Sequence, residues 1–189
     1  MKHLGNVSSE GGPFLIADAR ALRGWRGAAD DARDYKDVCR ALDAAGPSWG
    51  IPWRVDDLAA AIWEAEGEGT ADVFGGDDGG LVLVRGWFSA EVREGWVAAA
   101  REAASKPRDS KIVGDIETPS LVVAVLWTPE DGRCIREEDL SGSSNRPSGG
   151  LAIDGSSMLV RVAHTRFRWC VDRTKVPEGE AIRCFVEPV

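Results

Sequence analysis

The segment LVLVRGWF at residues 81–88 decides the fold of this chain. Its first four residues are all apolar, and the glycine-rich sequence GGDDGG precedes it at residues 75–80. A short apolar run that follows a turn is typical of a strand buried on both faces. We therefore predict a central strand at residues 81–88.

Helical spacing appears on both sides of this segment. Directly after it, Ser89 is suited to cap a helix and Glu91 to lie in its first turn. The apolar positions of this helix, which Lys106 and Pro107 would end, are Val92, Trp96, Ala99, Ala100 and Ala103. An earlier helix is predicted to pack on the sheet through Tyr35, Val38, Cys39 and Leu42.

Further strands are indicated by apolar content and alternation at residues 13–17, 112–113, 121–127 and 182–186. Residues 158–171 alternate over a long stretch, but Val160 and Val162 are out of phase with Phe167 and Trp169. One strand with a bulge at residues 163–166 would keep a single face buried. Residues 55–66 fit a short helix or a hairpin, and we favour strands at residues 61–64 and 71–74.

Runs of strands interrupted by two helices predict the α+β class, with a mainly antiparallel sheet, two packed helices and long polar loops. A length of 189 residues predicts one domain over residues 1–189. Within it, we expect residues 1–9 to be flexible. We also expect a mobile polar loop at residues 131–150, which end in SGSSNRPSGG.

Composition excludes several classes of protein. A hydrophobic content of 43% with eight tryptophans is too apolar for a disordered chain. The longest apolar run, residues 121–127, is far shorter than the roughly 20 residues that cross a bilayer, and no apolar signal-peptide region follows Met1. The four cysteines lack CxxC spacing, as expected for reduced thiols in the cytoplasm.

The acidic residues are concentrated in one part of the chain. Residues 43–80 contain nine acidic side chains and one basic side chain, so this window accounts for the whole formal net charge of −8. Such a balance argues against direct nucleic-acid binding and favours a basic protein partner. Acidic residues in turns also keep a protein soluble, so solvation alone is the simpler interpretation of this segment.

Few residues are suited to catalysis. The two histidines are His3, in the terminus expected to be flexible, and His164, expected inside a strand and partly buried. Neither GSSN nor GSSM is a nucleophile elbow, and GGDDGG places carboxylates where a phosphate loop needs amides. Asp72, Asp77 and Asp78 lack the ligand order of a calcium loop. No catalytic residue, metal or cofactor is predicted.

The residues predicted to contact a partner combine acidic side chains with tryptophans outside the buried patterns. They are Glu64, Glu66, Glu68, Asp72, Asp77, Asp78, Trp49 and Trp53. Two other functions stay open. One is a small carboxylate-dependent hydrolase that uses His164 with acidic residues of the hairpin expected from strands 61–64 and 71–74. The other is a structural or regulatory subunit of another bacterial assembly.

Four segments carry a resemblance to a known family. They are SSEGGPFLIADARALRGWRG (8–27), DYKDVCRAL (34–42), GGLVLVRGWFSAE (79–91) and GLAIDGSSMLVRVAHTRFRW (150–169). Together they resemble the bacterial immunity protein family numbered twenty-one, of polymorphic toxin systems. The sequence departs from that family at residues 55–68, which are more acidic, and in the polar segment 131–150.

The resemblance implies a small cytoplasmic protein that binds and neutralises a cognate toxin, with no catalytic residue carried over. A nuclease with a basic surface is a toxin that the acidic segment would fit. We therefore expect a non-catalytic binding protein with an acidic, tryptophan-bearing face.

Overall fold

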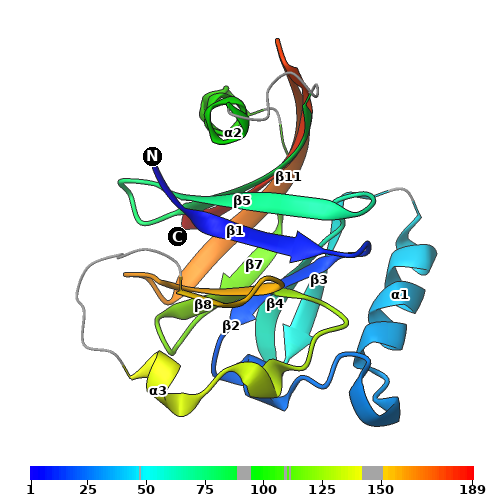
Figure 1. The fold of residues 1–189 in the computed structure, drawn as a ribbon. Helices are drawn as coiled ribbons and strands as arrows, with labels where there is room; N and C mark the ends of the chain where they lie inside the picture. Colours follow the sequence, from blue (N-terminus) through cyan, green and yellow to red (C-terminus); the bar gives the residue numbers. More distant parts are fainter. Residues whose placement is uncertain (47, 89–94, 109, 111, 142–150) are drawn as a thin grey trace.

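Two antiparallel sheets form the centre of the computed structural model, which describes every residue except 47, 89–94, 109, 111 and 142–150 (Figure 1). Sheet A has the strand order β1-β5-β6-β12-β11-β7, and sheet B has the order β3-β4-β2-β8-β10-β9. The strands are β1 (Lys2–Ser9), β2 (Phe14–Asp18), β3 (Gly50–Val55), β4 (Leu58–Trp63), β5 (Gly69–Gly75), β6 (Leu81–Phe88), β7 (Ile112–Glu117), β8 (Val122–Trp127), β9 (Leu151–Asp154), β10 (Ser157–Arg161), β11 (Arg166–Val176) and β12 (Gly179–Pro188). The predicted α+β class with mainly antiparallel sheet is confirmed.

The strand predicted to be central lies inside sheet A. β6 alternates between two cores: Leu81 and Leu83 face sheet B, whereas Val82 and Val84 face α2 (Trp96–Ser105). β8 does the same in sheet B, which explains why both segments read as continuous apolar runs. A layer of structure therefore covers the outer face of each sheet.

The outer face of sheet A is covered by α2, and that of sheet B by short helical segments (Figure 1). Buried alanines of α2 pack on Phe74, Val82 and Phe185. Sheet B is covered by α1 (Asp34–Ala45), by the 3-10 helices η1 (Ala21–Gly24), η2 (Ala29–Asp31) and η4 (Gly132–Cys134), and by α3 (Glu137–Leu140). The fold therefore has four layers: α2, sheet A, sheet B and the helical segments that cover sheet B.

A buried ion pair fixes α2 on its sheet. Arg183 is 1% exposed and donates hydrogen bonds to Asp172, with its Nη2 2.6 Å from the carboxylate. Its Nη1 also donates to the carbonyls of Ala103 and Lys106 at 2.8 and 2.9 Å, at the end of α2. The Ala103 carbonyl also accepts a hydrogen bond from Lys106 N at 3.2 Å, and Lys106 is the C-cap residue of α2. A sheet residue therefore binds the last carbonyls of the helix and sets its position.

Both predicted helices exist among the described residues, with differences in extent. In α1, Val38 is the buried residue, while Leu42 and Cys39 are partly buried. α2 begins at Trp96, and the predicted start at Ser89, with Glu91 and Val92, lies outside the described residues. Ala99, Ala100 and Ala103 are buried as predicted.

Strands β3 and β4 form a hairpin over residues 50–63, so residues 55–63 are strand and turn and not helix. Val55 of β3 pairs with Leu58 of β4, so Asp56 and Asp57 alone make the turn. Both aspartates have positive φ, 46° and 64°. A two-residue turn with two positive φ angles matches the twist of the flanking strands. The strands favoured at residues 61–64 and 71–74 overlap β4 and β5. The hairpin expected between these two strands is wrong, because β4 pairs with β3 and β2 in sheet B whereas β5 pairs with β1 and β6 in sheet A.

The prediction of one bulged strand over residues 158–171 is wrong. β10 pairs with β8 in sheet B, and β11 pairs with β12 in sheet A. The phase change between Val162 and Phe167 marks the point where the chain passes from one sheet to the other. Each half still buries its own apolar face in the core between the sheets, so no bulge is needed. His164 consequently lies in a connection and not in a strand.

Two segments expected to be flexible contain regular structure. Residues 1–9 include β1, which pairs with β5 at the edge of sheet A. Val7 of this strand is fully buried between the sheets, which helps to hold the terminus in place. The expected loop 131–150 includes η4 and α3, whose Leu140 is buried against sheet B. Residues 142–150 of that loop lie outside the described residues.

Candidate partner-binding surfaces

The eight residues predicted to contact a partner lie in four different places. Glu64, Glu66, Glu68 and Trp49 are near the start of β5; Asp72 is in its middle; Asp77 and Asp78 follow its end; Trp53 is on β3. Strand β5 has seven residues. At a rise of about 3.3 Å per residue, its two ends are about 20 Å apart. The acidic segment is therefore not one continuous face.

The connection between β4 and β5, residues 64–68, is here called the acid loop. Its backbone is held by Arg85 of β6, which is 2% exposed. Arg85 Nη2 donates to the carbonyl of Gly67 at 2.6 Å, and Nη1 donates to the carbonyl of Gly69 at 3.2 Å and to Ser9 Oγ at 3.0 Å. The buried guanidinium thus supplies hydrogen bonds that a neighbouring strand would otherwise supply. It orders a loop that carries three glutamates.

Burial acts on both charges at the base of the acid loop. It raises the pKa of Glu64, an effect that the positive charge of Arg85 opposes and the negative charge of Glu66 reinforces. Burial also lowers the pKa of Arg85, and the Glu64 carboxylate works against this shift. Glu66 and Glu68 are exposed beyond this pair. They are the carboxylates that the acid loop presents to solvent.

A second feature beside the acid loop is the tryptophan platform, formed by Trp49, Trp87, Arg173 and Glu180. Glu64 N donates to the Trp49 carbonyl at 2.9 Å, which joins the platform to the acid loop. The Arg173 guanidinium lies 5.6 Å from the Trp49 ring centroid, and its Nη2 is 2.6 Å from Glu180 Oε2. Glu180 pairs in register with Trp87, which is 39% exposed. Tryptophan and arginine at a surface are favoured contact residues of protein interfaces.

Asp72 is not available to a partner, contrary to its prediction as a contact residue. It is 2% exposed, with Oδ1 2.8 Å from His3 Nε2, and its Oδ2 accepts a hydrogen bond from Trp96 Nε1 at 3.1 Å. Burial raises the pKa of Asp72, and its bonds to His3 and Trp96 act in the opposite direction. Asp72 therefore ties β1 and α2 to β5.

The turn between β5 and β6 presents two exposed carboxylates. Asp78 folds back on the turn, where its Oδ1 accepts from Gly80 N at 3.0 Å. Its carboxylate approaches Gly76 so closely that a Cβ at that position would meet Asp78 Oδ1 and displace the aspartate side chain. Asp77 and Asp78 have no ion-pair partner in the described part of the chain.

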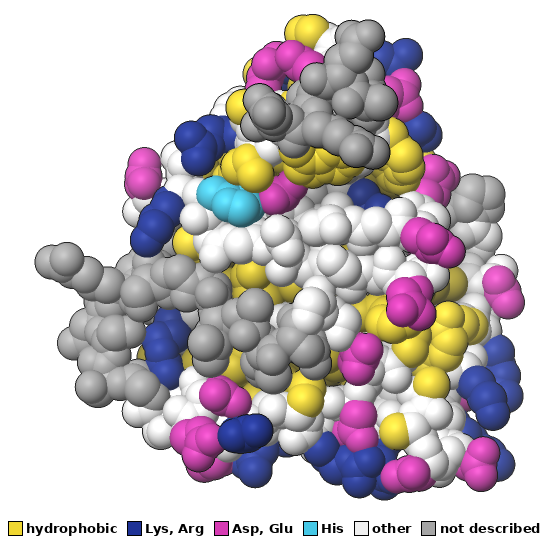
Figure 2. All heavy atoms as spheres, in the orientation of Figure 1, with side chains coloured by type: hydrophobic (Ala, Val, Ile, Leu, Met, Phe, Trp, Pro, Cys, Tyr) yellow, Lys and Arg dark blue, Asp and Glu magenta, His cyan; other side chains and the backbone are white. Residues whose placement is uncertain are grey.

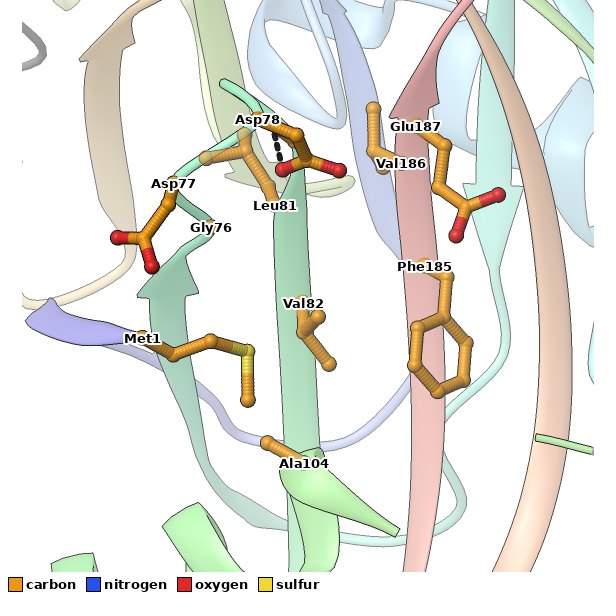
Figure 3. A pocket seen from close by; sticks show the side chains of 11 residues that line it. Met1, Gly76, Asp77, Asp78, Leu81, Val82, Ala104, Phe185, Val186 and Glu187 are labelled. Atoms are coloured by element: carbon orange, nitrogen blue, oxygen red, sulfur yellow. Dashed lines mark hydrogen bonds between the residues drawn. The ribbon is translucent and has the colours of Figure 1, made fainter. Parts of the chain in front are cut away.

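These two aspartates border a hollow of about 400 Å³, here called the acid-rimmed pocket. Figure 3 shows the side chains of Met1, Val82 and Phe185 between the carboxylate of Asp77 on one side and that of Glu187 on the other. Ala104 of α2 closes the pocket at one end. The pocket thus combines an apolar floor with a carboxylate rim.

The two sides of this rim differ in charge. Glu187 forms an ion pair with Arg108, whose guanidinium also lies 5.9 Å from the Phe185 ring centroid. Met1, which carries the α-ammonium group, lines the pocket, and Lys2 pairs in register with Gly75, but no ion pair with Asp77 or Asp78 is formed among the described residues. The negative potential of the pocket is therefore strongest next to the turn between β5 and β6.

Trp53 lies apart from both acidic regions. It is partly buried on the outer face of sheet B and lines an open hollow of about 600 Å³ with Pro52, Arg54, Ala59 and Asp115. Arg54 and Asp115 give this hollow one charge of each sign. Trp53 therefore does not extend the acidic surface, as the sequence had suggested it would.

Catalytic groups are not assembled within the described residues. His164 lies against Gly79 and edge-on to Phe167, with ring centroids 6.2 Å apart, and no hydrogen bond joins its ring to a carboxylate there. Burial, with the nearby Cys170, raises the pKa of Cys184, which keeps it in the thiol form. No group of three or more His, Cys, Asp or Glu side chains is arranged to hold a metal in the part that the structure describes. All four cysteines are free.

Several important residues were missed by sequence reasoning. Arg85 and Arg173 were not singled out, because the acid loop and Trp49 that they contact lie far from them in the sequence. Glu180 was also not singled out, although its partner Arg173 lies on the preceding strand of the same hairpin. Trp87 continues the alternation of β6, which favours burial, yet it is 39% exposed. His3 was dismissed with the terminus. These residues come together through the register between strands, and a local sequence motif does not contain that register.

Figure 2 shows acidic side chains along the side of this face on which α1 lies and β5 begins, with basic side chains at its lower edge. None of the described helices is long and apolar enough to cross a membrane. Comparisons with protein-family models, with curated proteins and with solved structures gave no match.

Proposed function

We propose that this chain is a non-catalytic binding protein of the bacterial cytoplasm that neutralises a cognate toxin by occupying a basic surface, such as that of a nuclease. The observation that carries the proposal is the junction of the acid loop with the tryptophan platform. Exposed carboxylates and a pair of surface tryptophans meet there on an ordered backbone. The resemblance to bacterial immunity proteins points to the same kind of partner.

The two parts of this surface have separate roles in the proposal. Glu66 and Glu68 attract a basic partner and raise the association rate, an effect that salt screens. Trp49 and Trp87 supply large apolar area with few rotatable bonds, and such contacts set the dissociation rate. Because Arg85 already orders the acid loop, binding costs little conformational entropy there.

The first experiment expresses each open reading frame next to this gene in a test host, with and without this protein. Growth and co-purification are scored together. The proposal expects one neighbour to kill the host and to be rescued through a stable complex. A harmless set of neighbours, or killing without rescue and binding, would contradict it and favour a scaffold role.

The second experiment locates the surface. The double variant Glu66→Gln/Glu68→Gln should slow association with the toxin about tenfold at low salt and much less at high salt. A matched control, Glu102→Gln/Glu138→Gln, removes the same charge from exposed positions on α2 and α3. If both double variants slow association equally, net charge matters and the acid loop is not the contact.

A further inference from the structure

We propose that the acid-rimmed pocket takes one lysine or arginine side chain of the partner. This assignment rests on the proposed function for the identity of the partner. The capture of an alkylammonium or alkylguanidinium group is a property of the pocket itself, and it can be tested without any toxin.

The charge of the pocket selects a cation. Asp77 and Asp78 are exposed, and no cation of the described chain is paired with either of them. Two carboxylates at one turn make the local charge negative, and a cation that enters the pocket beside them is attracted by both. Arg108 already occupies the Glu187 side, so the incoming positive group lies at the turn and not across the pocket.

The floor of the pocket selects a cation with an apolar stem. Val82 and Phe185 are 9% and 6% exposed, and Met1 is 40% exposed, so together they offer a strip of apolar surface under the carboxylates. Lysine and arginine bury their methylene stems along such surface while the charged head stays among polar groups. A hydrated metal ion would gain nothing from this floor.

The size and the walls of the pocket agree with this occupant. Its volume of about 400 Å³ lies in the range of about 300–1,000 Å³ found for ligand sites, so a full side chain fits. Ala104 forms one wall, and α2 is fixed there by Arg183 and the carbonyls of Ala103 and Lys106. The site is therefore preformed in the free protein.

The test uses the full chain and three small probes: the N-acetyl methylamides of arginine, lysine and norleucine. Binding is followed by NMR at the amides of Gly76, Gly80 and Val82 and at the methyl group of Ala104. The two cationic probes should shift these signals with a Kd in the millimolar range. Norleucine, which has the apolar stem without the charge, should bind at least tenfold more weakly. Binding of the cationic probes should weaken as salt is added.

Two double variants locate the effect. Asp77→Asn/Asp78→Asn keeps a side-chain oxygen at position 78 as an acceptor for Gly80 N and should weaken binding of the arginine probe at least tenfold. Glu66→Gln/Glu68→Gln removes the same charge from the acid loop, about 20 Å away, and should leave binding unchanged. Equal binding of norleucine and arginine, or equal loss in both variants, would overturn the proposal. So would the absence of shifts at the pocket with any probe.

The pocket and the proposed function fail in different ways. If the probes bind as expected and no neighbouring gene encodes a toxin, the pocket stands and its partner is another basic protein. If a toxin is neutralised but the arginine probe leaves the pocket signals unchanged, the toxin binds elsewhere and this inference is wrong.

Discussion

At the start of β5, the acid loop lies against Arg85 and the tryptophan platform; at its end, Asp77 and Asp78 lie beside an apolar pocket. Both regions carry carboxylates from the same acidic segment of the sequence. At the start, a buried arginine holds the loop and a surface arginine covers Trp49. At the end, the aspartates have only their own turn for support within the described chain.

The two regions differ in how the backbone that carries the carboxylates is held. At the start of β5, Arg85 ties the backbone of the acid loop into the fold while Glu66 and Glu68 stay exposed, so changing the residue that holds the loop should affect stability. Carboxylates at the end are held by a local turn, so changing them should affect ligand binding alone. A count of acidic residues along the chain treats the two ends as equal.

The largest effect should come from Arg85→Ala. It leaves the carbonyls of Gly67 and Gly69 without their donor and opens a cavity beneath the acid loop. We expect the free energy of unfolding to fall by about 3 kcal/mol, measured by urea denaturation. Hydrogen exchange should quicken at residues 64–69 and stay unchanged at residues 76–80. Arg54→Ala, an exposed control on β3, should cost less than about 1 kcal/mol.

Asp72→Ala should have the next largest effect on stability, because it removes the side chain that ties β1 and α2 to β5. The substitution deprives His3 and Trp96 of their shared acceptor. A loss of about 2 kcal/mol is expected, together with a change in Trp96 fluorescence. Asp72→Asn keeps an oxygen for Trp96 Nε1 and should cost less. Equal losses in the two variants would show that the hydrogen bond to Trp96 contributes nothing.

Glu64→Gln should change how stability depends on pH. Because burial raises the pKa of Glu64, the folded protein keeps this proton at a pH where the unfolded chain has lost it. The free energy of unfolding therefore falls as pH rises from the unfolded pKa of about 4.3 through the folded pKa. Urea denaturation from pH 4 upward should show a shallower decline for Glu64→Gln. Glu66→Gln is the neighbouring exposed control, and the same decline in both variants would contradict this assignment.

The smallest effect on stability should come from Asp77→Asn/Asp78→Asn. Both side chains are exposed, and the amide oxygen introduced at position 78 can still accept a hydrogen bond from Gly80 N. The free energy of unfolding should change by less than about 0.5 kcal/mol, as measured by urea denaturation. A loss above about 1 kcal/mol would mean that the turn, like the acid loop, is supported by its charges.

Local patterns were sufficient to predict most elements of the fold. β2, β6, β8 and β12 were found because each is a short apolar or alternating run between turn residues. β10 and β11 show the limit of this method. Their phase change was seen, and it was assigned to a bulge because periodicity records which face is buried and not which sheet the strand joins. Only pairing with β8 and β12 distinguishes the two cases.

The candidate site was predictable in composition but not in arrangement. Asp77, Asp78 and Trp49 lie on surfaces that offer a partner charge or apolar area. Asp72 has the same sequence character, yet its alternation in β5 places it under α2 and beside His3. Trp87 follows the buried pattern of its strand, yet it is 39% exposed. Both errors come from contacts between residues that are far apart in the sequence.

The place of β12 has a consequence for how the chain is made. It is the last strand in sequence, yet it lies between β6 and β11 in the interior of sheet A. During synthesis, β6 and β11 leave the ribosome before the strand that joins them, so sheet A cannot close until residues 179–188 have emerged. Until then β6 and β11 lack the strand that pairs with both, and a chain truncated before residue 179 would have neither its platform nor its pocket.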